Sequence, residues 1–328
     1  MRSGNGAAIE VTGLAKRFGD VQAVADISFT VARGEVFGLL GPNGAGKTTT
    51  INVLTGLARP DAGEVRVGGI DCTRNPKAAQ HLIGVVPDES NLYPELTGHE
   101  NLCFCGALYG LRRRDREARS RDLVERFGLG EAANRGFGGY SRGMKRKLTI
   151  AAGIIHGPPL LFLDEPTTGI DVESARQIRT MIAGLSAEGA TIFLTTHYIE
   201  EAERLCRRIA FVVAGRIVQV DTLDHLMEPI QGKHAMLLSI EGSATAAREL
   251  LSSRVQGLEF ATESPDTVRV ESRMPIRVGP LARALEDGGI EIVEARRLRP
   301  SLEDVFVRVT GIETNAMRRE REGRGQTP

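Results

Sequence analysis

The sequence lacks several features that mark other classes of protein. It has no tryptophan, and aromatic residues make up 5% of its 328 residues. No apolar run approaches the roughly 20 residues that a membrane-spanning helix needs, so we expect any membrane partner to be a separate chain. Residues 1–8 have no apolar core of a signal peptide, and we expect them to be flexible. The formal net charge is zero, which gives no global indication of a nucleic-acid partner.

Cysteine is also scarce, and its spacing excludes the common cysteine sites. The four cysteines form no C-x-x-C pair, so neither a zinc site nor a thiol redox motif is indicated. We expect reduced thiols in a cytoplasmic protein. Positive charge gathers at 112–116 and again at 318–324. Both runs are most simply explained as solvated surface.

What the sequence does contain is a glycine-rich stretch between two apolar patterns. Residues 41–48 fit G-x-x-x-x-G-K-[ST], ending in Lys47 and Thr48. An apolar segment at 36–40 predicts a buried strand before it, and the pattern at 49–57 predicts a helix after it. Glycine-rich backbone at a helix N-terminus is suited to bind phosphate. We expect phosphate contacts from Gly41, Pro42, Asn43, Gly44, Ala45, Gly46, Lys47, Thr48 and Thr49, with Mg²⁺ on the Thr48 hydroxyl.

A second motif places two acids at the end of a buried strand. The apolar run 160–163 leads directly into Asp164 and Glu165. Ligands of open α/β sheets bind at the carboxyl ends of the strands, and adjacent buried acids cost free energy unless they have partners. Asp164 could hold Mg²⁺, directly or through water. Glu165 could polarise an attacking water molecule.

Two further positions carry both a structural and a functional interpretation. His197 follows a predicted strand at 191–195 and reaches the same sheet edge as Glu165, so it is either a structural or a catalytic histidine. Ser141 opens a predicted helix. Its helix N-terminus either binds phosphate or is simply capped by the serine.

The segment ahead of the phosphate loop contains one aromatic residue of interest. Alternation at 9–14 and 25–31 predicts two antiparallel strands. They could bring Phe18 near a nucleotide, where it could stack on adenine. The alternative is that Phe18 belongs to the core.

The middle of the chain favours a helical subdomain at about 90–157. Thr97 followed by Glu100 fits a helix N-cap. Helical patterning continues to about Phe127 with a break near Gly110. Further strands are expected at 65–67, 81–86, 211–213 and 216–220.

The character of the chain changes after about Leu226. A linker at 229–232 precedes a βαββαβ order, which is that of a ferredoxin-like unit. We therefore expect an accessory or dimerisation domain at 233–311 and a disordered tail at 312–328. Strands are expected at 236–240, 258–261, 267–271 and 290–295, and helices at 245–252, 276–286 and 301–309.

The order of these motifs resembles the nucleotide-binding subunit of an ATP-binding cassette (ABC) transporter over residues 9–226. The motifs are the phosphate loop, Tyr140-Ser141-Arg142-Gly143-Met144, the strand end 160–165 and Thr196-His197. Drug-resistance and sodium-efflux exporter ATPases of the ABC-2 class, the daunorubicin-resistance type among them, look most similar. The resemblance implies a phosphate-loop α/β fold with a mixed sheet, an antiparallel β subdomain and a helical subdomain at 9–230.

The resemblance also implies roles for single residues. Glu165 would be the general base and His197 the switch histidine. Phe18 would stack on adenine, and Asp171 would lie at a dimer contact. Ser141 and Gly143 would bind the γ-phosphate of ATP held by a second copy of the chain. ATP would then join two subunits, and hydrolysis would release them.

Two positions depart from the family pattern. Arg142 replaces a glycine of the usual signature. Asp88, followed by Glu89, stands where the family has a glutamine. A carboxylate at position 88 could bind Mg²⁺ or nucleotide-bound water, but it would repel phosphate.

The implied partners are a second copy of the chain, bound through ATP, and a separate ABC-2 permease. The protein would lie at the inner face of the cell membrane, and no nucleic acid is expected. One alternative is a soluble cassette ATPase acting on DNA or ribosomes. Repair ATPases of that type carry a long coiled-coil insertion, and the chain shows no sustained heptad run. Ribosome-acting relatives usually have two cassettes in one chain, and this sequence has a single phosphate loop. The other is a small-molecule kinase, which would leave the Ser141 helix and the acidic strand end without a purpose.

Overall fold

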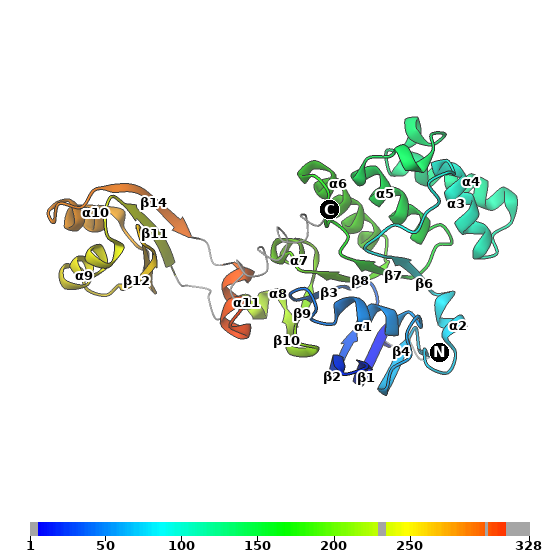
Figure 1. Ribbon diagram of the computed structural model, residues 1–328, viewed down its shortest axis with the longest axis horizontal. Coiled ribbons are helices and arrows are strands. Elements are labelled where there is room, and N and C mark those ends of the chain that lie inside the picture. Colours follow the sequence, from blue (N-terminus) through cyan, green and yellow to red (C-terminus); the bar gives the residue numbers. More distant parts are fainter. Residues whose placement is uncertain (1–5, 229–233, 299–300, 313–328) are drawn as a thin grey trace. The chain divides into compact units, whose positions relative to one another are not determined.

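The computed structural model describes residues 6–228, 234–298 and 301–312 (Figure 1). The chain divides into two compact units, with residues 224–308 in the second and the remainder in the first. The second unit thus begins before the expected position 233. Within the part of the chain that is described, every helix is too short or too polar to cross a lipid bilayer.

An antiparallel sheet forms the first part of the first unit. Its strands lie in the order β2-β1-β4-β5, with bounds β1 Ile9–Phe18, β2 Val21–Val31, β4 Ala62–Val67 and β5 Ile70–Asp71. Ala8 is buried, and its amide donates to the Val31 carbonyl at 2.7 Å. The expectation of a flexible N-terminus is therefore wrong at Ala8, because the sheet pairing already includes it.

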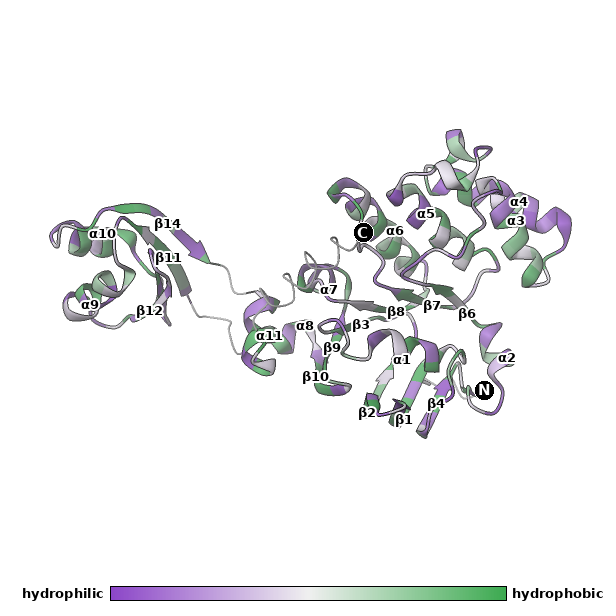
Figure 2. Ribbon diagram, in the orientation of Figure 1, coloured by the Kyte–Doolittle hydropathy of each residue, from purple (hydrophilic) through white to green (hydrophobic). Residues whose placement is uncertain are grey.

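A six-stranded mixed sheet forms the centre of the first unit, in the order β10-β9-β3-β8-β7-β6. Its strands are β3 Val36–Leu40, β6 Ile83–Val86, β7 Leu160–Asp164, β8 Thr191–Thr196, β9 Arg208–Val213 and β10 Arg216–Thr222. All its pairings are parallel except that between β9 and β10. Strands β3, β7 and β8 are buried along their length, and Figure 2 shows them as hydrophobic. Parallel pairing brings the carboxyl ends of these three strands to one edge.

Helix α1 (Lys47–Leu54) contacts strands of both sheets. Their shared core includes three stacked rings, with centroids of Phe29 and Phe37 5.3 Å apart and those of Phe37 and Phe193 5.7 Å apart. The helix begins at Lys47, two positions before the expected start. Gly46 is its N-cap, with a left-handed φ of 96° that glycine adopts without strain.

The helical subdomain follows the expected division at Gly110. Its helices are α3 (Gly98–Leu108), α4 (Arg113–Arg126) and α5 (Arg142–Gly153), with 3₁₀ turns η1 Gly130–Ala132 and η2 Phe137–Gly139. Thr97 and Glu100 form the predicted capping box. Helix α2 (Pro76–Gln80) was not expected, and it shortens the strand expected at 81–86. Helices α6 (Val172–Ala187), α7 (Ile199–Leu205) and α8 (Leu223–Met227) complete the described helices up to residue 228.

The second unit has the predicted ferredoxin-like topology. Strands and helices alternate as β11 (His234–Ile240), α9 (Ala244–Arg254), β12 (Glu259–Ser264), β13 (Thr267–Ser272), α10 (Val278–Glu286) and β14 (Ile292–Leu298). The antiparallel sheet has the order β12-β13-β11-β14. Alternate residues such as Met236, Leu238 and Val270 pack against Leu251 and Leu281 of the two helices. Helix α11 (Leu302–Thr310) begins after Ser301, which caps it as predicted: its hydroxyl accepts a hydrogen bond from the Asp304 amide at 3.4 Å and donates one to the Asp304 carboxylate at 2.9 Å.

Candidate nucleotide-binding site

The predicted phosphate loop connects β3 to α1. Gly44 and Gly46 have φ angles of 76° and 96°, in the left-handed region. A Cβ at Gly41 or Gly46 would overlap the carbonyl oxygen of Val212 or Ala23, whereas a Cβ at Gly44 would meet no atom within 4 Å. The loop thus packs closely on the protein at two glycines and is open at the third.

Unpaired backbone donors line the open side of this loop. In the described structure, the amides of Gly44, Gly46, Thr48 and Thr49 have no hydrogen-bond acceptor. Asn43 and Thr48 are exposed, while Thr49 is half-buried. Unpaired amides at a helix N-terminus, beside a lysine, have the donor character that phosphate oxygens require. The loop therefore fits the phosphates of a nucleotide.

Lys47 connects the phosphate loop to the acidic strand end. Its side chain is 6% exposed, and its Nζ donates to the carbonyls of Gly41 at 2.9 Å and Pro42 at 3.1 Å. Its Nζ also lies 3.2 Å from Glu165 Oε1. A buried cation is stable only when it is paired and hydrogen-bonded, as here.

Glu165 lies at the centre of a polar cluster after β7. Its Oε2 lies 2.7 Å from His197 Nδ1 and accepts a hydrogen bond from the Thr168 hydroxyl at 3.1 Å. Burial raises the pKa of this carboxyl, but His197 and Lys47 oppose that effect and hold the pKa below its usual value. Glu165 is therefore a carboxylate at neutral pH, positioned to accept a proton.

Asp164 is buried on β7 and accepts a hydrogen bond from the Thr195 hydroxyl of β8. No group of three or more potential metal ligands (His, Cys, Asp or Glu) occurs among the described residues. Mg²⁺ binds one or two protein oxygens and takes its other ligands from phosphate and water. Asp164 and the exposed Thr48 hydroxyl offer such oxygens, and they fit Mg²⁺ arriving with a nucleotide.

A second patch joins the first turns of α5 and α6. Ser141 caps α5 by accepting a hydrogen bond from the Met144 amide at 3.2 Å, and Asp171 caps α6 by accepting one from the Ser174 amide at 2.8 Å. A Cβ at Gly143 would overlap the Ser174 hydroxyl, so the two helix starts pack against each other. The structure brings Ser141, Gly143 and Asp171 together, but among the described residues no hydrogen bond or ion pair joins them to Lys47 or Glu165.

Phe18 ends β1 and is 54% exposed. Lys16 Nζ lies 5.1 Å from the centre of its ring. The interpretation of Phe18 as a core residue is therefore wrong, and its ring is available for stacking.

Comparison with known proteins agrees with this geometry. A family model described as ABC transporter matches residues 24–168. A daunorubicin resistance ATP-binding protein of Streptomyces coeruleorubidus is 39% identical, over 93% of this chain and 96% of that protein. A Nod factor export ATP-binding protein of Bradyrhizobium diazoefficiens is also 39% identical, over 93% and 97% of the two chains.

The chain belongs to the ABC transporter ATP-binding proteins. It is an ATPase, as the sequence motifs predicted. The solved structure of an ATP-binding subunit of an ABC transporter aligns with a TM-score of 0.62 and 32% identity, over 68% of this chain and 93% of that one. A dimeric bacterial ABC transporter cassette aligns with a TM-score of 0.61 and 25% identity, over 66% and 98%.

Asp88 of this ABC ATPase is held by a residue that the sequence analysis did not single out. Arg146 of α5 is 7% exposed, and it donates to the carbonyls of Pro87 at 2.6 Å and Asp88 at 2.5 Å. It also lies 3.3 Å from Asp88 Oδ1. Burial raises the pKa of Asp88, with opposition from Arg146 and a further increase from Glu165 and Asp164. Asp88 is therefore bound to helix α5, whose first turn carries Ser141 and Gly143.

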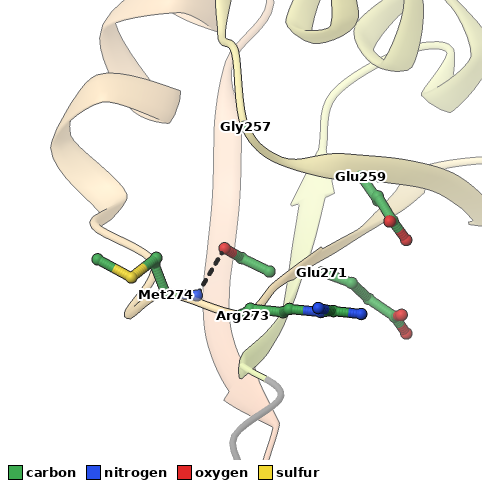
Figure 3. Close-up of a pocket in the computed structure, with 6 residues that line it drawn as sticks. Gly257, Glu259, Glu271, Arg273 and Met274 are labelled. Carbon is green, nitrogen blue, oxygen red and sulfur yellow. Dashed lines mark hydrogen bonds between the residues drawn. The ribbon is translucent and has the colours of Figure 1, made fainter.

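The ABC ATPase also has a shallow hollow in its second unit. None of the residues that line it is one of the predicted site residues. Figure 3 shows Glu259, Glu271 and Arg273 around it, with the Met274 amide donating to the Ser272 hydroxyl at 3.0 Å. Its charged groups are accessible to solvent and form no buried polar set. We assign it no ligand.

Proposed function

We propose that this ABC ATPase energises export through a separate permease of the ABC-2 class, at the inner face of the cell membrane. Its relatives support export, since their names include daunorubicin resistance and Nod factor export. The observation that carries the proposal is the division of the site into two patches of one chain. One is Lys47 with Glu165 and His197, and the other is Ser141 with Gly143 and Asp171.

We infer that two copies bring unlike patches together around ATP. The phosphate loop and Lys47 would bind the phosphates of ATP, and Phe18 would stack on its adenine. Ser141 and Gly143 of the other copy would complete the γ-phosphate site, and Asp171 would lie at the contact. Thr48 and Asp164 would hold Mg²⁺, which when bound neutralises phosphate charge.

Hydrolysis would then follow from the position of Glu165. Its carboxylate would accept a proton from water as the water oxygen bonds to the γ-phosphorus and the bond to the bridging oxygen breaks. His197 would hold Glu165 in place through Nδ1. Loss of the γ-phosphate removes the group that both copies bind, so the dimer would open and transmit motion to the permease.

Copurification from the native membrane tests this proposal. After solubilisation in mild detergent, the tagged chain should retain a membrane protein that has no phosphate loop of its own. Its ATPase rate should depend on that partner and vanish in Lys47→Ala. Recovery without any membrane protein, and with an ATPase rate that reconstituted membranes do not change, would contradict a role in export.

A further inference from the structure

The turn that carries Glu165 is fixed to β8 at its first residue. Glu165 has a φ of 49°, a left-handed conformation that is strained for a side chain with a Cβ. Its amide donates to the Thr195 carbonyl at 3.1 Å. A strained residue keeps its conformation only if the surrounding structure holds it on both sides.

The other end of the turn is fixed by a buried acid on α7. The Thr167 hydroxyl donates to Glu201 Oε1 at 2.7 Å, and both side chains are buried. Between the two ends, the Thr168 amide donates to the Glu165 carbonyl at 3.2 Å. The residues from Glu165 to Thr168 are thus held by Thr195 at one end and by Glu201 at the other.

The environment of Glu201 gives it no evident structural advantage. It is 2% exposed, and its Oε2 has no hydrogen-bond partner among the described residues. Burial raises the pKa of this carboxyl, and hydrogen bonds with the Thr196 and Thr167 hydroxyls only partly oppose that effect. Burying the carboxyl therefore costs free energy that a hydrocarbon side chain of the same size would avoid. The carboxyl must therefore serve by what it binds, and the Thr167 hydroxyl that it binds belongs to the turn of Glu165.

We propose that Glu201 is a positioning residue for ATP hydrolysis, and that it acts on Glu165 through the Thr167 hydroxyl. This inference rests on the proposal that Glu165 is the base. Without the bond between Thr167 and Glu201, the turn is fixed at one end only, and the strain at Glu165 relaxes. The carboxylate then leaves the position from which it accepts the proton of water. Nucleotide binding should change little. Among the described residues neither the Thr167 nor the Glu201 side chain forms a hydrogen bond or ion pair with the phosphate loop, and the pair of Glu165 with Lys47 is one that phosphate oxygens replace when a nucleotide binds.

Three variants isolate this bond. Glu201→Met keeps the length of the side chain but removes the acceptor, and Thr167→Val keeps the shape but removes the donor. Each should lower kcat by about 10- to 100-fold, since small misplacements of catalytic groups have effects of this size, while the KM for ATP stays within about threefold. Glu201→Gln keeps an acceptor oxygen and should restore kcat to within about threefold of wild type.

The double variant Glu201→Met/Thr167→Val should be no slower than Glu201→Met, because Thr167→Val removes an interaction that Glu201→Met has already lost. Ile182→Ala, in the buried face of α6, provides a destabilised control with unchanged kcat at a temperature where it is folded. Unchanged kcat in Thr167→Val would overturn the proposal, as would a Glu201→Gln variant as slow as Glu201→Met. Glu165→Gln tests the base separately, since normal turnover in that variant rejects the base assignment itself.

Discussion

At the scale of single residues, the site is defined by buried charges that hold one another. Lys47 is bonded to Gly41, Pro42 and Glu165, and Glu165 is bonded to His197. Each of these groups would be costly to bury alone. When a nucleotide binds, Lys47 must therefore give up these contacts and bind phosphate oxygens instead. The contacts that it loses and those that it gains are both charge-assisted hydrogen bonds or ion pairs.

Lys47→Ala should weaken ATP binding by about 10- to 100-fold, because a hydrogen bond to a charged group contributes about 1.5–3 kcal/mol. Titration with a fluorescent ATP analogue would measure this affinity. Lys77→Ala, which removes an exposed lysine from α2, is the matched control and should bind as wild type does. Equal affinities for the two variants would reject the phosphate-loop assignment.

Glu201 also predicts a pH dependence of stability. Burial raises its pKa above the ordinary 4.5, so the folded protein retains a proton that the unfolded chain releases. Folding then loses stability as the pH rises from 4.5 through the folded-state pKa. Glu201→Gln carries no such proton. The melting temperature of Glu201→Gln relative to wild type should therefore rise between pH 4.5 and 7.5. A constant difference over this range would show that the carboxyl does not titrate between the two states.

At the scale of elements, helix α5 joins two parts of the site. Its N-terminus carries Ser141 and Gly143, which pack on α6. One turn further, Arg146 holds the backbone after β6 at Pro87 and Asp88. A shift of α5 would therefore move Ser141 and Gly143 together with Asp88. Helix α5 therefore couples the position of Ser141 and Gly143 to that of the backbone after β6.

Arg146→Met should lower the free energy of unfolding by about 1–3 kcal/mol, because it leaves carbonyl acceptors without their donor. Asp88→Gln should cost less, since Arg146 keeps both backbone contacts. Arg113→Met, which removes an exposed pair with Glu117, is the control and should cost about 0.5 kcal/mol or less. Chemical denaturation of the three variants measures the order. An Asp88→Gln variant less stable than Arg146→Met would show that the carboxylate, rather than the backbone, is the main partner of Arg146.

At the scale of the whole molecule, two incomplete patches favour an assembly of two copies. Among the residues described, a single chain has no hydrogen bond or ion pair between its phosphate loop and the patch of Ser141, Gly143 and Asp171. Isologous pairing about a twofold axis would bring the patch of Ser141, Gly143 and Asp171 of each copy to the phosphate loop of the other, since such interfaces are self-complementary. The second unit has its own core and supplies none of the predicted nucleotide contacts.

Glu165→Gln should form a stable dimer in ATP, because it binds nucleotide but loses the base, which lowers turnover by roughly 10²- to 10⁴-fold. Size-exclusion chromatography with ATP and with ADP would show the dimer in ATP alone. Adding Lys47→Ala should abolish the dimer. A Glu165→Gln protein that remains monomeric in ATP while binding it tightly would reject the assembly through ATP.

The parts of the fold that the sequence predicted well are those that depend on neighbouring residues. The capping box at Thr97 and the break at Gly110 arise within a few residues of backbone, and the βαββαβ order gave the ferredoxin-like topology. The five-residue helix α2 was missed because it has too few residues to show a periodic pattern. The predicted start of α1 was two residues too late. The prediction used the apolar pattern, which begins after Lys47 and Thr48, whereas the helix begins directly after the left-handed Gly46.

The sequence by itself determined the phosphate loop, the acidic end of β7 and the family, because these reside in short runs of consecutive residues. Tertiary structure alone decided that Arg146 holds Asp88, 58 positions away, and that Glu201 holds Thr167, 34 positions away. It also decided that Phe18 is exposed. For Arg146 and Glu201 the physical reason is that a buried ionisable group needs a partner, and the folding of separate segments onto one another determines which residue that partner is. The exposure of Phe18 likewise depends on which segments pack against β1.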